Sequence, residues 1–148
     1  MSDDASVTKD LIQTLEDGKD GFAKGAEKLE KDGETALAGT FQQLGAEREQ
    51  LRAELHDLAA AYGDQIEDSG SVTAKAHRGW MAVKDALSGS SPEGVLDAAE
   101  QGEDHAVSEY EKALEADISP ELKVVVQRQL ATVRSAHDQV KALRDAKS

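Results

Sequence analysis

Four long stretches of this sequence carry apolar residues at alternating steps of three and four, the spacing that gives an α-helix one apolar face. They cover residues 7–30, 34–62, 92–116, and 120 to near the C-terminus. Each stretch spans roughly 36 to 43 Å as a helix, at about 1.5 Å per residue. Four long helices that each have one apolar face bury those faces most simply against one another, so the pattern predicts a helical bundle.

Residues that break or start helices separate the four stretches. Asp32-Gly33 interrupts the pattern between the first two. Ser91-Pro92 and Ser119-Pro120 each place an N-cap serine before a proline at the first helical position, which predicts the start of the third and fourth helices. Between the second and third, residues 63–71 are rich in Gly, Ser and Asp, and a short additional helix is expected from Ser71 to about Leu87.

The connections between the long helices are predicted to be short, long and short, the pattern of ferritin-like bundles. Strand signals are absent from the sequence. We therefore expect an all-α, ferritin-like four-helix bundle, with the short extra helix in the long crossover between the second and third long helices. Residues 1–6 are expected to form a flexible tail, and residues 7–148 a single bundle domain.

Charge and composition limit the classes of function. Lys and Arg number 17 against 30 Asp and Glu, so the net charge of −13 disfavours binding to nucleic acid or to an anionic membrane. The absence of cysteine excludes disulfides, thiol catalysis and cysteine-based zinc sites. The opening "MSDDASVTKD" is acidic and polar, and no apolar run approaches the ~20 residues that span a bilayer, so the cytoplasm is the expected compartment.

Three of the four apolar faces are interrupted by a polar residue near the middle of the helix: Arg48, Glu103 and Gln129. The first helix has Gly18 near its own middle, which would leave room for a large polar neighbour. We expect a buried polar layer in which Arg48 and Glu103 form an ion pair, because an unpaired buried charge is very costly. Gln129 and His137 would supply further hydrogen bonds.

Other interpretations of these polar residues stay open. Long Arg and Glu side chains at the edge of an apolar face often reach out to water, and periodicity can be misread by one residue. A buried ion pair would instead fix the register of the helices. A metal or catalytic site would use the same residues as ligands or acids.

The sequence lacks the ligand motif of di-iron bundles. Those proteins place Glu-x-x-His on two helices, whereas the four histidines here follow Ala53, Ala74, Gly102 and Arg134 at that spacing. No cofactor is therefore expected, with iron or manganese as the alternative. The weak candidate ligands for that alternative are Glu16, Glu47, Glu54, Glu103 and His137.

The string "AHRGW" (76–80) places His77 and Trp80 at i, i+3 on the predicted short helix. The structural interpretation is that Trp80 covers one end of the core while His77 donates to a nearby carbonyl. The functional interpretation is a docking surface for a partner protein or a second copy. No catalytic triad order, nucleotide-binding glycine loop or EF-hand loop is visible in the sequence.

Five strings that cover nearly the whole chain carry a family resemblance. They are "LIQTLEDGKDGF" (11–22), "AEREQLRAEL" (46–55), "SGSVTAKAHRGW" (69–80), "GEDHAVSEYEKAL" (102–114) and "VQRQLATVRSAHDQVKALRD" (126–145). In these strings the sequence resembles a bacterial family of ferritin-like four-helix bundles described only as a domain of unknown function. The resemblance implies a ferritin-like bundle linked with bacterial stress or envelope physiology. It implies neither an activity nor a metal site.

These observations favour a non-enzymatic structural or interaction module of a bacterial stress response. A protein partner or self-association is expected, through the short helix and the acidic faces. The alternative is a metal-binding, di-metal carboxylate protein that uses the region around Glu103.

Overall fold

The computed structural model describes residues 4–61 and 91–147, and every regular element in these ranges is an α-helix. The helices are α1 (Asp4–Lys31), α2 (Thr35–Ala61), α4 (Pro92–Glu115) and α5 (Pro120–Lys147). The predicted short helix over 71–87, with His77 and Trp80, lies outside the described residues. The prediction of an all-helical protein with four long helices is thus confirmed for the described ranges. None of the described helices combines the length and the apolarity that crossing a membrane requires.

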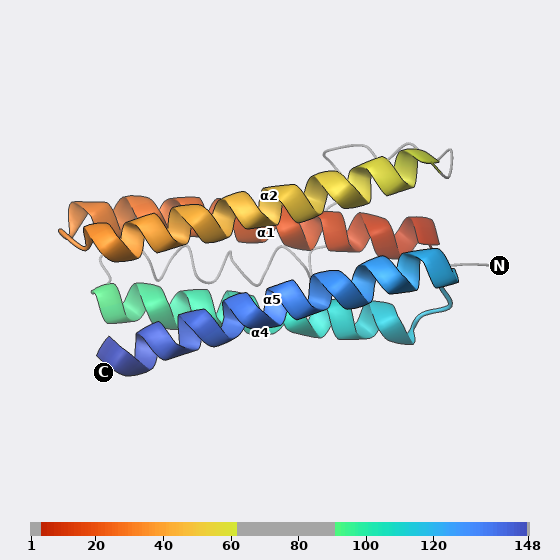
Figure 1. Ribbon diagram of the computed structural model, residues 1–148. Helices are drawn as coiled ribbons and strands as arrows, with labels where there is room; N and C mark the ends of the chain where they lie inside the picture. The colour runs from red at the N-terminus through yellow and green to blue at the C-terminus, as the bar shows by residue number, and fades with distance from the viewer. Residues whose placement is uncertain (1–3, 62–90, 148) are drawn as a thin grey trace.

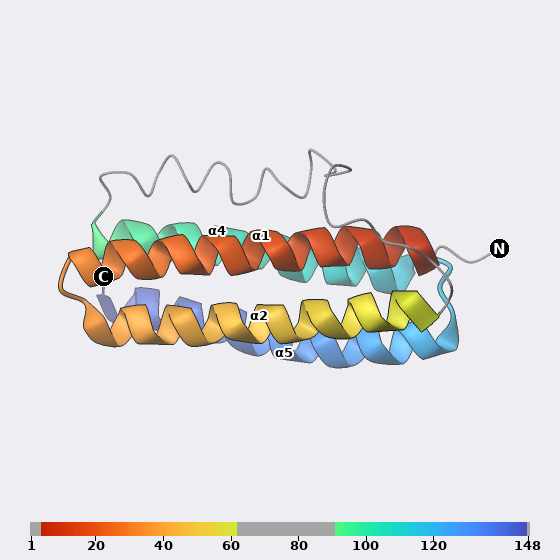
Figure 2. The same cartoon turned by 90° about the horizontal axis from the view of Figure 1, so that it is seen from above.

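The four helices lie side by side as a bundle of two antiparallel pairs (Figure 1). One pair is α1 and α2, the other is α4 and α5, and α1 also packs on α4. The second view shows α1 beside α4 and α2 beside α5 (Figure 2). Helix α2 ends at the opposite end of the bundle from the start of α4, so these two helices run in the same direction.

Gly33 ends α1 and allows the sharp reversal into α2. Its φ of 82° lies in the left-handed region, which glycine adopts without steric cost. The backbone N–H of Gly33 donates to the carbonyl of Glu30 at 3.1 Å, and that of Glu34 donates to the carbonyl of Leu29 at 2.8 Å. These two bonds form a Schellman motif, which satisfies carbonyls that the end of the helix would otherwise leave free.

The two serine-proline starts predicted for the second half of the chain are confirmed. Ser91 Oγ accepts a hydrogen bond from the backbone N–H of Gly94 at 3.2 Å. Ser119 Oγ accepts one from Leu122 N–H at 3.3 Å. In each case the serine side chain satisfies one of the free N–H groups of the first helical turn.

The first helix begins earlier than the sequence pattern predicts. Asp4 to Ser6 were expected in the flexible tail, but α1 starts at Asp4. The Asp4 side chain is buried, and its Oδ1 accepts a hydrogen bond from the backbone N–H of Ser119 at 2.8 Å. A carboxylate in the first turn also interacts favourably with the helix dipole. These contacts tie the start of α1 to the start of α5, which the apolar periodicity could not reveal.

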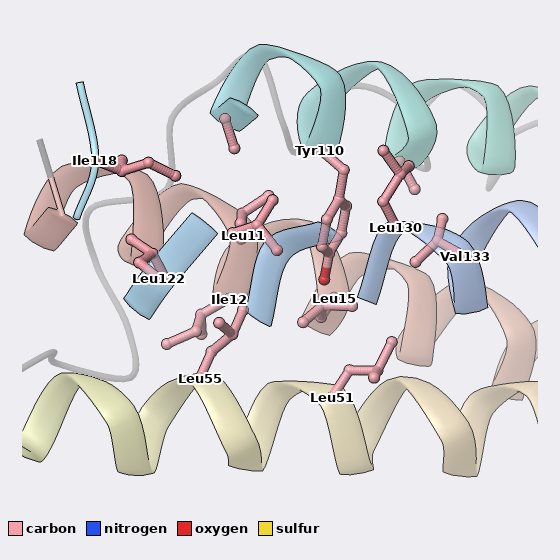
Figure 3. Packing of buried hydrophobic residues seen from close by; sticks show 13 residues of the cluster. Leu11, Ile12, Leu15, Leu51, Leu55, Tyr110, Ile118, Leu122, Leu130 and Val133 are labelled. Atoms are coloured by element: carbon pink, nitrogen blue, oxygen red, sulfur yellow. The ribbon is translucent and has the colours of Figure 1, made fainter. Parts of the chain in front are cut away.

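The apolar faces predicted from the sequence form the core. It consists of two clusters along the bundle axis, one nearer the α1–α2 turn and one nearer the α4–α5 turn. In the second cluster Tyr110 extends from α4 into the bundle close to Leu15 and Leu130 (Figure 3). Arg48 and Glu103 lie where the two clusters meet: along α2, Leu44 belongs to the first cluster and Leu51 to the second.

Candidate functional site

The centre of the bundle holds an ion pair between Arg48 of α2 and Glu103 of α4. Both side chains are 0% exposed. Nη2 of Arg48 donates to Oε1 and Oε2 of Glu103, each at 2.5 Å. Each residue takes the place of an apolar residue in the repeat of its own helix, so the fold itself aims both side chains inward. The pair joins two helices that lie diagonally across the bundle.

Helix α1 shapes the space around the guanidinium. A Cβ atom at Gly18 would lie 3.1 Å from Nη1 of Arg48, so glycine makes room for the arginine. The Phe22 ring lies on the same helix, with its centroid 5.5 Å from Cζ of Arg48, a cation–π contact. Nε and Nη1 of Arg48 have no hydrogen-bond acceptor among the described residues. The guanidinium is therefore held by Glu103 and by packing.

Electrostatics make each member of the pair depend on the other. Burial raises the pKa of Glu103, and the adjacent guanidinium of Arg48 opposes that shift. Breaking a buried pair by removing one partner leaves an uncompensated charge in the core. Since both carboxylate oxygens already accept from Arg48, Glu103 serves as a structural acceptor in this geometry.

Gln129 of α5 forms the centre of a second polar network. Its Oε1 accepts a hydrogen bond from the hydroxyl of Tyr110 at 2.7 Å. Its Nε2 donates to the carbonyl of Leu51 at 3.2 Å and to Oε1 of Glu54 at 2.8 Å. Burial raises the pKa of Tyr110, so the hydroxyl stays protonated and remains a donor. The buried amide therefore has partners for its oxygen and both of its N–H donors.

The single polar layer expected from the sequence is thus divided into two networks. Gln129 has no hydrogen bond to Arg48 or Glu103 among the described contacts, and it lies within the core cluster that contains Val126 and Leu130. The reason is the relative register of the helices. Position 129 on α5 lies level with Leu51 and Tyr110, about one helical turn from the level of Arg48.

His137 also differs from the expectation of a buried group. Its side chain is 21% exposed and lies at the edge of α5. Nε2 of His137 contacts Oδ1 of Asp104 on α4 at 2.5 Å, and Nδ1 contacts Oδ1 of Asp138 at 3.3 Å. Partial burial lowers the pKa of His137, but the hydrogen bonds with Asp138 and Asp104 outweigh it, so the pKa is raised. The contact between His137 and Asp104 was not predicted from the sequence.

The five weak candidate metal ligands are not brought together. In the described part of the chain, no group of three or more His, Asp or Glu side chains is arranged to hold a metal ion. Glu54 contacts Gln129 and Arg128, and Glu103 contacts Arg48. His137 contacts Asp104 and Asp138, while Glu16 and Glu47 are half-buried at other positions.

The fold and this centre define a four-helix bundle whose interior is crossed by a buried ion pair. Residues 4–116 match the family described as "Domain of unknown function (DUF2383)". Since the match covers more than half of the chain, the protein belongs to that family. Arg48 and Glu103 lie within the matched residues, whereas Gln129 and His137 of α5 lie beyond them. A search among curated proteins found no match.

Proposed function

We propose that this protein is a ferritin-like bundle without catalytic activity that serves as a structural or interaction module in a bacterial stress response. The ferritin-like assignment is supported by the arrangement of the helices. Two antiparallel pairs are placed so that α2 and α4 run in the same direction, as in bundles with one long crossover. The link to stress and the cytoplasm as the compartment rest on the resemblance and on the composition.

The observation that carries the non-catalytic proposal is the contact between Arg48 and Glu103. Di-metal carboxylate bundles project carboxylates and histidines inward from facing helices. In this chain the inward carboxylate near mid-bundle is held through both oxygens by a buried guanidinium. A positive charge at that position disfavours a cation and favours a role for Glu103 in fixing the helices.

Elemental analysis tests this proposal against the metal-binding alternative. The wild type, Glu103→Gln and the control Glu93→Gln, which changes an exposed glutamate of α4, would be purified without chelators from cells supplied with iron, manganese and zinc. We expect far less than one ion per chain in all three proteins. Stoichiometric metal in the wild type and in Glu93→Gln, lost in Glu103→Gln, would overturn the proposal.

The predicted contact surface around His77 and Trp80 lies outside the described residues and stays a prediction. Sedimentation velocity of the wild type and of Trp80→Ala tests whether it joins two copies. A monomer in both cases would exclude self-association through this surface. A dimer that dissociates in Trp80→Ala would support it.

A further inference from the structure

A groove lies between α1 and α2 on the side of the pair that faces solvent, close to the turn that joins them. It encloses about 610 Å³. Its floor is lined by small and apolar residues from both helices: Ala23, Ala26, Phe41, Gly45 and Ala46. Ala23 and Ala46 are exposed, whereas Ala26, Phe41 and Gly45 are buried, so the part of the floor that is open to water is formed by the two exposed alanines. The groove extends from the exposed sides of α1 and α2 down to Ala26 and Phe41, which also belong to the core.

Two glycines bring α1 and α2 close together near the groove. A Cβ at Gly45 would lie 3.7 Å from the backbone oxygen of Lys19, so α2 approaches the α1 backbone closely at this position. A Cβ at Gly25 would come within 2.8 Å of the Phe41 ring, which therefore packs directly against α1. Small residues thus allow the close contact between α1 and α2 beside which the groove lies.

The charges at the rim indicate what could occupy the groove. Lys19, Glu27, Glu30 and Lys31 of α1 and Glu49 of α2 line its edges. Lys19 and Glu49 form an ion pair across the groove at 3.6 Å, and Glu49 also binds Arg52 at 2.7 Å. Neither Glu27 nor Glu30 has an ion-pair partner within residues 4–61 and 91–147. The rim therefore offers two carboxylates to an incoming cation, next to an apolar floor.

The net charge of the chain favours a basic segment of another protein over a second copy of this protein as the occupant of the groove. A second copy would bring another net charge of −13 against this surface, which opposes association. A basic segment would instead be attracted over a distance of about one Debye length, ~8 to 10 Å at physiological ionic strength. An amphipathic helix suits the shape, because helices bind in apolar grooves through residues at i, i+3, i+4 and i+7.

We propose that the groove between α1 and α2 binds an amphipathic helix of a partner protein that carries lysine or arginine beside its apolar face. Its apolar side chains cover Ala23 and Ala46, and its basic side chains reach Glu27 and Glu30. This inference rests on the proposed role as an interaction module and names the surface and the chemistry of its partner. No covalent step is involved.

Binding of a synthetic peptide tests the proposal. The probe is a fluorescent leucine–lysine peptide of about five helical turns, at ~3.6 residues per turn, with its leucines on one face. The control peptide has the same composition in an order that spreads the leucines around the helix. Fluorescence anisotropy should show at least ~10-fold weaker binding of the control peptide. Equal affinity for both peptides, or no binding of either, overturns the proposal.

Replacing either of two alanines with lysine distinguishes an effect of the groove from an effect of the net charge of the chain. Ala46→Lys adds a bulky cation to the floor of the groove, and Ala131→Lys adds the same group to an exposed position on α5. Circular dichroism would first show that both remain helical. We expect Ala46→Lys to weaken peptide binding by ~10-fold or more and Ala131→Lys by less than about twofold. Equal weakening would overturn the groove as the site.

The outcomes for this surface and for the proposed function can be distinguished. Stoichiometric metal that depends on Glu103 would refute the non-catalytic role whatever the peptide does. A metal-free protein that fails to discriminate between the peptides would refute the groove and leave the interaction role to another surface.

NMR chemical-shift changes on peptide addition should fall along α1 and α2. Changes confined to α4 and α5 would contradict the assignment.

Discussion

Gly18 of α1 lies directly against the guanidinium of Arg48 on α2, where a Cβ would stand 3.1 Å from Nη1. Glycine inside a helix costs about 1 kcal/mol relative to alanine. Gly18 lies where Arg48, the largest fully buried side chain of the described residues, packs against α1. Gly18, Arg48 and Glu103 therefore act as one unit, because the space, the cation and its counterion come from three different helices.

Gly18→Ala should destabilise the protein although alanine is the better helix former. The added methyl group pushes on a guanidinium that Glu103 holds through both oxygens, and such overpacking costs about 1–3 kcal/mol. The control is Gly39→Ala on α2, where nothing lies within 4 Å of the new methyl group. It should stabilise by up to about 1 kcal/mol. Urea unfolding followed by circular dichroism measures both changes, and an equal gain in the two variants would refute the contact.

Tyr110→Phe should expose the dependence of Gln129 on its hydroxyl donor. Loss of the 2.7 Å hydrogen bond leaves the buried oxygen of Gln129 without a partner, at a cost of about 1–3 kcal/mol. In a Gln129→Met background the tyrosine hydroxyl is itself unsatisfied, so the same substitution should cost clearly less. The free energies of unfolding of the wild type, Tyr110→Phe, Gln129→Met and the double variant give the coupling energy between the two side chains. An identical cost in both backgrounds would mean that the bond contributes nothing.

His137 should make stability depend on pH. Its pKa is raised in the folded protein, so its stabilisation is complete below the unfolded pKa of about 6.5 and is lost as pH rises through the folded value. His137→Gln should therefore lower the free energy of unfolding at pH ~5.5 more than at pH ~8. His56→Gln is the control, because no ion pair of His56 is found in the part of the chain that the structure describes. The same pH response in the two variants would contradict the role of His137.

The apolar periodicity was enough to predict the four helices and many of the residues that they bury. Apolar residues at helical spacing along α1 and α4, among them Leu11, Leu15, Leu96 and Tyr110, are buried, as are Gly18, Arg48, Glu103 and Gln129. The periodicity reports on one helix at a time, so it shows which residue points inward. It does not show the axial offset between neighbouring helices. For that reason Gln129 was placed with Arg48, although it lies level with Tyr110.

Contacts at the edge of the bundle could not be predicted from the sequence for a related reason. His137 lies one position after the buried Ala136, so a small error in the width of the apolar face moves it from core to rim. Asp4 precedes the first apolar residue of α1 and meets Ser119 only because the two helix starts share one end of the bundle. Both contacts depend on how the helices are placed relative to one another.

The role of the central ion pair can be measured with Arg48→Met, Glu103→Leu and the double variant. If the pair is a buried structural unit, each single substitution leaves a buried charge without its partner and costs about 3–5 kcal/mol. The double variant replaces both charges with apolar side chains and should be more stable than either single variant, close to the wild type or above it. The free energies of unfolding in urea give the coupling directly. Single costs below about 1 kcal/mol that simply add in the double variant would contradict the account.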